Sequence, residues 1–181
     1  MAETRDALLR AGAELFAARG LDGPSLDDIC AAAGKTRGAF YVHFEDRDAF
    51  LVAVMERIGL PLLDEIFAGA TNLATVASRF LSAAATGAYP LTRKGGVRPH
   101  QLIDACMRSP AIRARYVGLV RDAIDRLAAI VANDVAPAHA REVATFLLAA
   151  VIGAQTMLEL GVPIDLPRTG ASLLTLLGET A

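Results

Sequence analysis

The sequence predicts an all-α protein in which a small amino-terminal head precedes a larger helical body. Three observations predict this fold class: alanine, leucine and arginine are abundant, apolar residues recur at three- and four-residue spacing, and no stretch alternates at period two as a half-buried strand does. The chain has 181 residues, of which 54% are hydrophobic, which is enough to bury a sizeable core. Glycine and proline breaks divide it into about nine helices.

Two helices are expected at the start of the chain. The first spans residues 3–19 with one apolar stripe, and Gly20 is placed to end it in a left-handed cap. Ser25 is a good N-cap for the second, which spans residues 26–33. Gly34 is placed to end this second helix.

Further helices follow at regular breaks. Thr36 is a suitable cap for a third helix that reaches about Phe44, and Asp46 for a fourth that Pro61 is expected to kink or interrupt. Turn-forming residues then divide the remainder into about five more helices. These breaks lie near residues 69–72, 89–99, 109–110, 133–137 and 161–167.

Composition narrows the class of protein. The net charge of -2 gives no overall basic character, so any nucleic-acid binding must be local. Two cysteines, Cys30 and Cys106, and an amino terminus without a signal-peptide pattern favour a cytoplasmic protein. The longest apolar stretch, Val143–Leu158, is shorter than the roughly 18 to 20 residues of a membrane span, so no membrane partner is expected.

The sequence contains no complete motif for an enzyme active site. Gly34-Lys35-Thr36 imitates the end of a phosphate-binding loop, but Ile29 stands where that motif needs its first glycine. The three histidines lack the paired spacing of a zinc site, and no nucleophile elbow occurs. We therefore expect no catalytic residues, no metal and no cofactor.

The two short helices around Gly34 have the spacing of a helix-turn-helix, whose second helix enters the major groove of DNA. Residues 33–44 contain Lys35, Arg37 and His43 and no acid, although residues 1–50 carry more acids than bases. Positive charge is thus concentrated where DNA would lie.

Helical spacing separates the two faces of the second short helix. Phe40 and Phe44 form its inner stripe, whereas Thr36, Arg37 and Tyr41 face outward with groups that suit phosphate oxygens or a guanine edge. The alternative is that the rings of Tyr41 and His43 are buried against the first helix, and that Lys35 and Arg37 are ordinary solvent-exposed charges.

Four ordered stretches carry a resemblance: FAARG at residues 16–20, SLDDICAAAG at 25–34, GAFYVHF at 38–44 and RDAFL at 47–51. Together they resemble the amino-terminal signature of TetR-family transcriptional regulators. The resemblance implies a homodimer with a DNA-reading head and a helical body that binds a small molecule and then releases DNA. It places Thr36, Tyr41, His43 and Arg47 at positions near the DNA backbone, and Arg37, Gly38 and Ala39 near the bases. Lys35 and Ser25 complete the predicted DNA-binding set.

This sequence departs from the family pattern at three of those positions. The family commonly has an apolar residue at Lys35, a threonine at Ala39 and a lysine at Arg47. The alanine leaves only a methyl to meet a thymine methyl, so base preference does not transfer from relatives.

The body is expected to form a dimer face and a ligand pocket. The helix over residues 137–160 is apolar nearly all round and must be covered on both sides. With the last helix it suits the four-helix interface that the resemblance implies, a monomer with one large core being the alternative. The predicted interface residues are Ala149, Ile152, Gly153, Leu173, Leu174 and Leu177.

Ligand pockets are mostly apolar with a few convergent polar groups. The polar candidates are His100, Gln101, Tyr116, Gln155 and Thr156, and the wall candidates are Phe80, Met107, Phe146 and Met157. Ordinary core or surface placement is the alternative for each of them.

The sequence thus predicts a DNA-binding domain over residues 1–48 and an effector-binding and dimerisation domain over residues 49–181. The predicted function is a transcriptional regulator, a repressor that a small apolar effector releases from a palindromic operator of double-stranded DNA. One alternative is a dimeric DNA-binding protein whose body is a protein-interaction platform without an effector. Another is a helical enzyme, which no motif supports.

Overall fold

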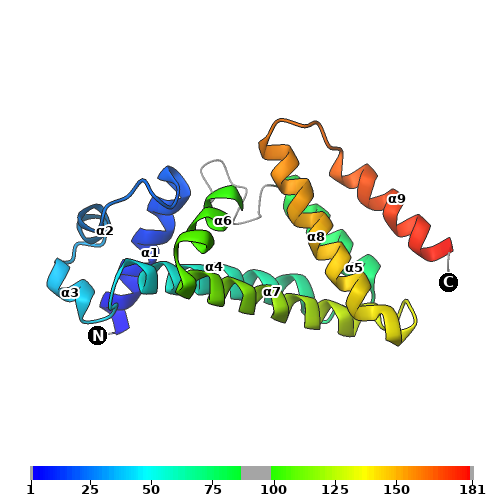
Figure 1. Cartoon of the computed structure of the whole chain (residues 1–181), viewed down its shortest axis with the longest axis horizontal. Helices are drawn as coiled ribbons and strands as arrows, with labels where there is room; N and C mark the ends of the chain where they lie inside the picture. The colour runs from blue at the N-terminus through cyan, green and yellow to red at the C-terminus, as the bar shows by residue number, and fades with distance from the viewer. Residues whose placement is uncertain (1, 87–98, 180–181) are drawn as a thin grey trace. The chain divides into compact units, whose positions relative to one another are not determined.

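The computed structural model describes residues 2–86 and 99–179. Nine α-helices and one 3-10 turn make up these residues, and no strand occurs among them (Figure 1). The all-α prediction is therefore confirmed, as is the number of helices. The helices are α1 (Ala2–Arg19), α2 (Leu26–Ala32), α3 (Arg37–Tyr41), α4 (Arg47–Phe67), α5 (Leu73–Thr86), α6 (Pro99–Arg108), α7 (Pro110–Val131), α8 (Ala140–Glu159), which follows the 3-10 turn Pro137–His139, and α9 (Leu166–Glu179).

The chain folds as two compact units. The first comprises Met1–Pro61 and Pro90–Gly118, and the second comprises Leu62–Tyr89 and Leu119–Ala181. Helices α4 and α7 each supply a segment to both units. The first unit includes the start of α4 and the apolar side of α6, because both belong to the same core as α1. The functional division at residue 48 stays a prediction.

An aromatic cluster forms the centre of the first unit. The Phe50 ring lies 4.9 Å from that of Phe44, 5.2 Å from that of Phe40 and 6.1 Å from that of Phe16, measured between centroids. All four side chains are buried, and tilted or edge-on contacts of this kind stabilise beyond their buried area. Helices α1, α3 and α4 are thereby packed around one apolar centre.

Helix α1 approaches α4 closely at Gly12. A methyl group built on Gly12 would lie 2.4 Å from Phe50 Cζ and 3.3 Å from Val54 Cγ2, both of which belong to buried side chains. Only glycine fits this position without a shift of the core. The periodicity of α1 gives no sign of this contact, since the partner residue lies almost forty positions away.

Two glycines end the first two helices as predicted. Gly20 has φ 75° and Gly34 has φ 63°, in the left-handed region that glycine adopts without strain. At Gly34 the Lys35 amide donates to the Cys30 carbonyl (2.9 Å) and the Gly34 amide to the Ala31 carbonyl (3.1 Å). This pair of bonds is a Schellman motif, and it fixes the turn between α2 and α3.

The sequence predicts that Pro61 kinks or interrupts the fourth helix, and the interruption is wrong, because α4 continues through Pro61 to Phe67. A proline inside a helix costs about 3 kcal/mol. Burial of an apolar side chain contributes about 1.5 to 3 kcal/mol, and α4 buries Phe50 and Leu51 before the proline and Ile66 after it. Packing on both sides of Pro61 therefore outweighs the lost hydrogen bond.

Polar contacts fix the helix ends of the second unit. The Asp134 carboxylate accepts the Leu73 amide at 2.6 Å, and so caps the start of α5 from the loop after α7. Arg79 of α5 donates to the carbonyls of Ile66 (3.1 Å) and Ala68 (2.5 Å) at the end of α4. These contacts tie α4, α5 and α7 together around the interior of the unit.

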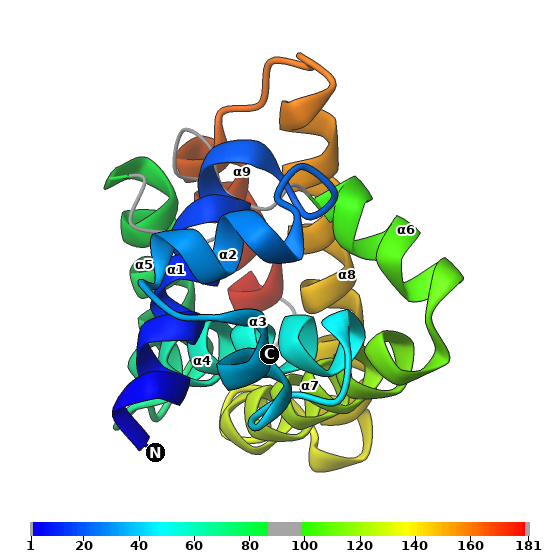
Figure 2. The ribbon, with the colours of Figure 1, turned by 90° about the vertical axis from the view of Figure 1, so that its left-hand side faces the viewer.

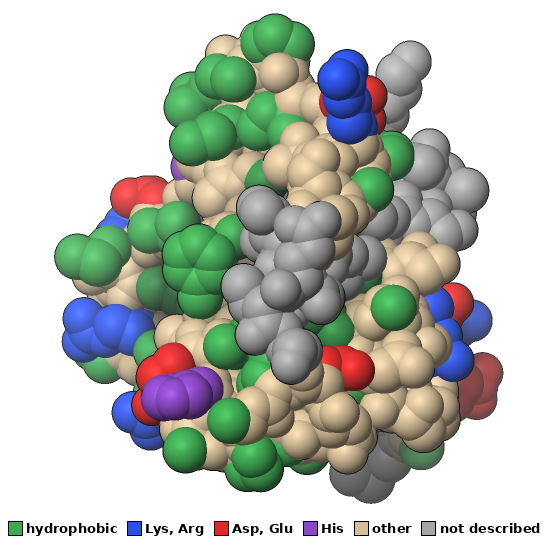
Figure 3. Space-filling view, turned by 90° about the vertical axis from the view of Figure 1, so that its right-hand side faces the viewer, with side chains coloured by type: hydrophobic (Ala, Val, Ile, Leu, Met, Phe, Trp, Pro, Cys, Tyr) green, Lys and Arg blue, Asp and Glu red, His purple; other side chains and the backbone are tan. Residues whose placement is uncertain are grey.

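Helix α8 is apolar, but most of its residues are not buried within the second unit. With its preceding turn it forms a 22-residue segment, Pro137–Leu158, of mean hydropathy 1.3, of which 11% is buried. This segment is long and apolar enough to cross a membrane, but core helices of soluble proteins often have the same length and composition, so a single such helix does not indicate a membrane. Phe146 is 66% exposed and Met157 51% exposed on this helix. Figure 3 shows hydrophobic side chains gathered on the side of the chain that carries α8 and α9.

Candidate functional site

The helix α2 begins at a complete capping box. The Ser25 amide and hydroxyl both donate to Asp28 Oδ2 at 2.9 Å, and the Asp28 amide donates to Ser25 Oγ at 3.1 Å. The bond from the Ser25 backbone amide is the main reason that the pKa of the Asp28 carboxyl lies below its ordinary value, and the Ser25 hydroxyl adds to it. Both polar groups of Ser25 are thus used to start α2.

Helix α3 is a single, well-capped helical segment at the surface of the first unit (Figure 2). The Thr36 hydroxyl accepts the Ala39 amide at 3.2 Å, which makes Thr36 the N-cap, and the buried Phe40 ring anchors the helix to the aromatic cluster. The helix ends at Tyr41, so it is shorter than the predicted run to Phe44. Its short length leaves few outward positions.

Arg37, Gly38 and Tyr41 are the exposed residues of α3, and Val42, directly after the helix, is exposed as well. Tyr41 is 52% exposed and packs its ring edge-on against Phe40, with 5.5 Å between centroids. The phenol is thus held by its ring while its edge reaches solvent. Gly38 has open space above it, since the nearest side-chain atom to an added Cβ is 3.8 Å away. Another molecule can therefore approach the backbone of α3 at this point.

The Arg37 guanidinium is oriented by two neighbours. Its Nη1 donates to the two carboxylate oxygens of Asp27 at 3.3 and 3.4 Å. The pKa of Arg37 is raised, first by a side-chain hydrogen bond with Tyr41 and then by the charge of Asp27. Arg37 and Tyr41 form one polar pair on the outer side of α3, with an acid beside it on α2.

Arg47 faces the interior of the head. Its Nη2 donates to the Leu21 carbonyl at 2.6 Å and to the Pro24 carbonyl at 3.1 Å, and its guanidinium lies 5.8 Å from the centroid of the Phe16 ring. Arg47 thereby holds the loop between α1 and α2 against the start of α4. The predicted contacts of Ser25 and Arg47 with DNA stay predictions, and the structure gives both side chains a role inside the head.

The remaining predicted residues flank α3. Lys35 and His43 are half-buried, and the His43 ring lies 6.3 Å from that of Phe44. Sequence reasoning missed Arg5 of α1, an exposed residue whose guanidinium lies 5.5 Å from the Phe44 centroid and adds a cation near the end of α3. It also missed the exposed Val42. Arg5 does not stand out by spacing, because its place near α3 depends on how α1 packs beside Phe44.

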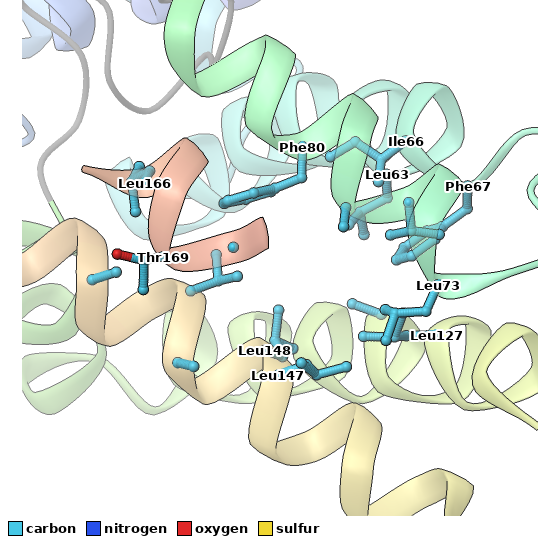
Figure 4. A pocket seen from close by; sticks show the side chains of 17 residues that line it. Leu63, Ile66, Phe67, Leu73, Phe80, Leu127, Leu147, Leu148, Leu166 and Thr169 are labelled. Atoms are coloured by element: carbon cyan, nitrogen blue, oxygen red, sulfur yellow. The ribbon is translucent and has the colours of Figure 1, made fainter. Parts of the chain in front are cut away.

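The second unit contains an apolar cavity of about 200 Å³ (Figure 4). Its walls come from the end of α4 and from α5, α7, α8 and the start of α9. Among the described lining residues, Thr169 supplies the one polar side chain. The lining residues are Leu63, Ile66, Phe67, Leu73, Val76, Ala77, Phe80, Ala123, Leu127, Leu147, Leu148, Ala150, Val151, Ala154, Leu166, Thr169 and Gly170.

Of the nine residues predicted to bind an effector, the structure places Phe80 at this cavity. Four belong to the first unit, namely His100, Gln101, Met107 and Tyr116. The other four lie on α8 but outside the lining: Phe146 and Met157 are exposed, Gln155 is buried, and the Thr156 hydroxyl donates to the Ile152 carbonyl at 2.9 Å. Pockets usually contain several polar groups, whereas Thr169 is the one polar side chain among the described lining residues of this cavity. The predicted roles of these nine residues in effector binding stay predictions.

The predicted dimer residues of α8 are accessible in the single chain. Ala149 is exposed, Ile152 and Gly153 are half-buried, and nothing lies within 4 Å of a Cβ built on Gly153. The structure does not describe the side chains of the other three predicted interface residues, Leu173, Leu174 and Leu177. Two copies of α8 can therefore approach each other at Gly153 without rearrangement of the chain.

No group of three or more metal-ligating side chains occurs within residues 2–86 and 99–179. Both cysteines, Cys30 and Cys106, are buried, and burial raises the pKa of each thiol. A protonated, enclosed thiol is a poor nucleophile and a poor metal ligand.

Comparison with known proteins assigns the head. Residues 8–54 match the family of bacterial regulatory proteins described as the tetR family. Residues 8–54 thus have the sequence of a TetR-family DNA-binding head. Over 60 residues it is 42% identical to the HTH-type transcriptional repressor BepR of Brucella suis biovar 1 (strain 1330), a stretch that covers 33% of this chain and 29% of BepR. It thus spans less than a third of the length of that TetR-family relative.

The TetR-family fold extends over the whole chain. A TetR-family transcriptional regulator from Rhodococcus sp. has a TM-score of 0.76 at 19% identity and covers 98% of this chain and 99% of its own. The solved SmeT–triclosan complex has a TM-score of 0.68 at 25% identity and covers 96% of this chain and 89% of SmeT. BepR is named as a transcriptional repressor and the Rhodococcus protein as a transcriptional regulator.

Proposed function

We propose that the protein is a dimeric, cytoplasmic transcriptional repressor that binds a palindromic operator through α3 and leaves it when a small apolar effector enters the body. The observation that carries the proposal is the helix-turn-helix of α2 and α3, whose outward side carries the paired Arg37 and Tyr41. A second helix presented in this way is the element that enters the major groove.

The contacts follow from the exposure of α3. Arg37 and the amide groups near Gly38 and Ala39 lie closest to base edges, while Thr36, Tyr41 and His43 serve phosphate oxygens. Lys35 adds a cation before the helix begins. Because the net charge is only -2, affinity comes from these few contacts and from their repetition in two subunits rather than from bulk attraction.

A dimer is supported by the exposed apolar surface of α8. Soluble proteins rarely leave large apolar patches uncovered, and such patches mark interfaces. The exposed Phe146 and Met157 lie on the same helix as Ala149, Ile152 and the open position at Gly153. A two-fold pair of α8 and α9 helices would cover this surface and set two copies of α3 about one turn of DNA apart.

An effector is supported by the cavity of the second unit. An apolar cavity of about 200 Å³ in a unit of this size is the kind of site that small apolar ligands occupy. SmeT, which shares the fold, was solved in complex with triclosan. The repressor assignment is supported by the name of the relative BepR.

Selection of bound DNA from a random double-stranded pool tests the proposal. The expected result is an enriched inverted repeat, bound by a dimer with an affinity that falls steeply as salt rises. Enrichment of no sequence would contradict operator binding. Binding of the selected DNA that no apolar compound weakens would instead favour a body that serves as a platform for other proteins.

A further inference from the structure

The cavity of the second unit has a closed apolar end and a more accessible polar side. Leu73, Val76, Ala123 and Leu127 are all less than a tenth exposed and form its buried wall. Thr169, at the start of α9, is exposed to solvent. A bound molecule would therefore meet hydrocarbon along its body and a hydroxyl at one end.

The Thr169 hydroxyl can bond to a ligand, whereas the other described hydroxyl groups of α8 and α9 already donate to backbone carbonyls. Among the described hydroxyl side chains of α8 and α9, Thr145, Thr156, Ser172 and Thr175 each donate to the carbonyl four residues earlier, at 2.7 to 3.0 Å. No such bond forms at Thr169, although its backbone amide donates to the Asp165 carbonyl at 2.9 Å. The one polar side chain of the lining is thus also the one hydroxyl of these helices without a bond to the chain.

The lining also excludes charge. None of its seventeen residues is ionisable, and an ion moved into such surroundings without a partner loses several kcal/mol of hydration. The Arg126 guanidinium, 5.0 Å from the centroid of the lining residue Phe67, is already bound to Asp64 at 2.8 Å. A carboxylate or ammonium group would find no counter-ion among the described lining residues.

We propose that the cavity binds an uncharged molecule of one or two rings that carries a single hydroxyl or carbonyl group, which bonds to Thr169. An apolar cavity of about 150 Å³ admits benzene, so one of about 200 Å³ admits a slightly larger ring system. The inference rests on the proposed function, because it names the chemical class of the proposed effector.

Calorimetric titration of the purified protein with four probes tests the inference. These are 2-naphthol and 2-methylnaphthalene, which are neutral, and 2-naphthoate and 2-naphthylmethylammonium, which carry opposite charges on the same ring system. Both neutral probes are expected to bind, with 2-naphthol the tighter, and both charged probes to bind at least a hundredfold more weakly. Binding of neither neutral probe, or equal binding of a charged one, would overturn the proposal.

Two variants locate the binding. Thr169→Val removes the hydroxyl at nearly constant shape and should weaken 2-naphthol about three- to tenfold, the effect of one hydrogen bond, while leaving 2-methylnaphthalene unchanged. Ala123→Leu should fill the cavity and abolish binding of both neutral probes. Ala129→Leu, at an exposed position of the same helix α7, is the matched control and should bind as the wild type does.

The outcomes separate this inference from the proposed function. If Ala123→Leu unfolds, the Thr169→Val titrations still decide the question, and equal losses for both neutral probes, or none for 2-naphthol, contradict the Thr169 contact. Operator binding is measured on the same preparation. A protein that binds its operator but neither neutral probe refutes the ligand class alone, whereas a protein that binds the probes but no DNA refutes the proposed regulator alone.

Discussion

Replacement of Gly12 by alanine is a sharp test of how the head is packed. The new methyl would lie 2.4 Å from Cζ and 2.7 Å from Cε1 of Phe50, whereas ordinary contact begins near 3.4 Å. The Phe50 ring or helix α1 must therefore move by about 1 Å. Phe50 is fully buried between the rings of Phe16, Phe40 and Phe44, so it has no empty space to enter.

Two opposing terms set the size of the effect. Overpacking of a dense core costs about 1 to 3 kcal/mol, and alanine in place of glycine inside a helix contributes up to about 1 kcal/mol of stability. The expected net loss for Gly12→Ala is about 1 to 2 kcal/mol in the free energy of unfolding. Because α3 rests on the same aromatic cluster through Phe40, operator affinity should fall as well.

Urea denaturation followed by circular dichroism, at one fixed protein concentration, measures this loss. Gly118→Ala is the matched control, since it also lies inside a helix and its nearest neighbour, Arg115 Nη1, is 3.9 Å from the added methyl. The control should gain up to about 1 kcal/mol from helix propensity. Equal stabilisation of both variants would refute the close approach of α1 and α4.

Four further variants test the Arg47 contacts, the capping box of α2 and the dimer. Arg47→Met keeps the apolar stem but leaves two loop carbonyls without their donor, so chemical denaturation should show a loss of about 1 to 3 kcal/mol; an unchanged midpoint would contradict the proposed clamp. Ser25→Ala removes an N-cap and should cost about 0.5 to 2 kcal/mol. Asp28→Asn should be less stable than the wild type at pH 7. Because folding lowers the pKa of the Asp28 carboxyl, this difference in stability should shrink as the pH falls below the ordinary pKa of that carboxyl, 3.8. A difference that is constant with pH would contradict the capping box. Gly153→Arg should stay folded, since nothing lies within 4 Å of that position, but should appear as a monomer in light scattering; a persistent dimer would place the interface elsewhere.

The fold of the head could be predicted from sequence because its signals are local. The left-handed glycines Gly20 and Gly34 and the caps at Ser25 and Thr36 act within a few residues, and each appears in the structure where the pattern predicted it. The continuation of α4 through Pro61 could not be predicted in this way, because burial on both sides of the proline decides it.

The parts of the candidate sites that lie within one helix could be predicted from the sequence, whereas the parts that depend on contacts between helices could not. Arg37 and Tyr41 lie one helical turn apart on one short helix, and their exposure follows from the burial of Phe40. The Asp27 partner of Arg37 and the inward bonds of Arg47 depend on how separate helices pack. The cavity draws its walls from five helices, and of the predicted effector residues only Phe80 lies in its lining.

The most direct test of operator binding through α3 is fluorescence anisotropy with the selected DNA and single variants of that helix. Arg37→Ala and Tyr41→Phe should each weaken binding by about 1 to 3 kcal/mol, or about 5- to 150-fold in Kd. Arg121→Ala, which also removes one exposed arginine but from the second unit, should leave Kd nearly unchanged. Unchanged affinity in both folded α3 variants, or an equal loss in Arg121→Ala, would contradict the assignment of α3 as the recognition helix.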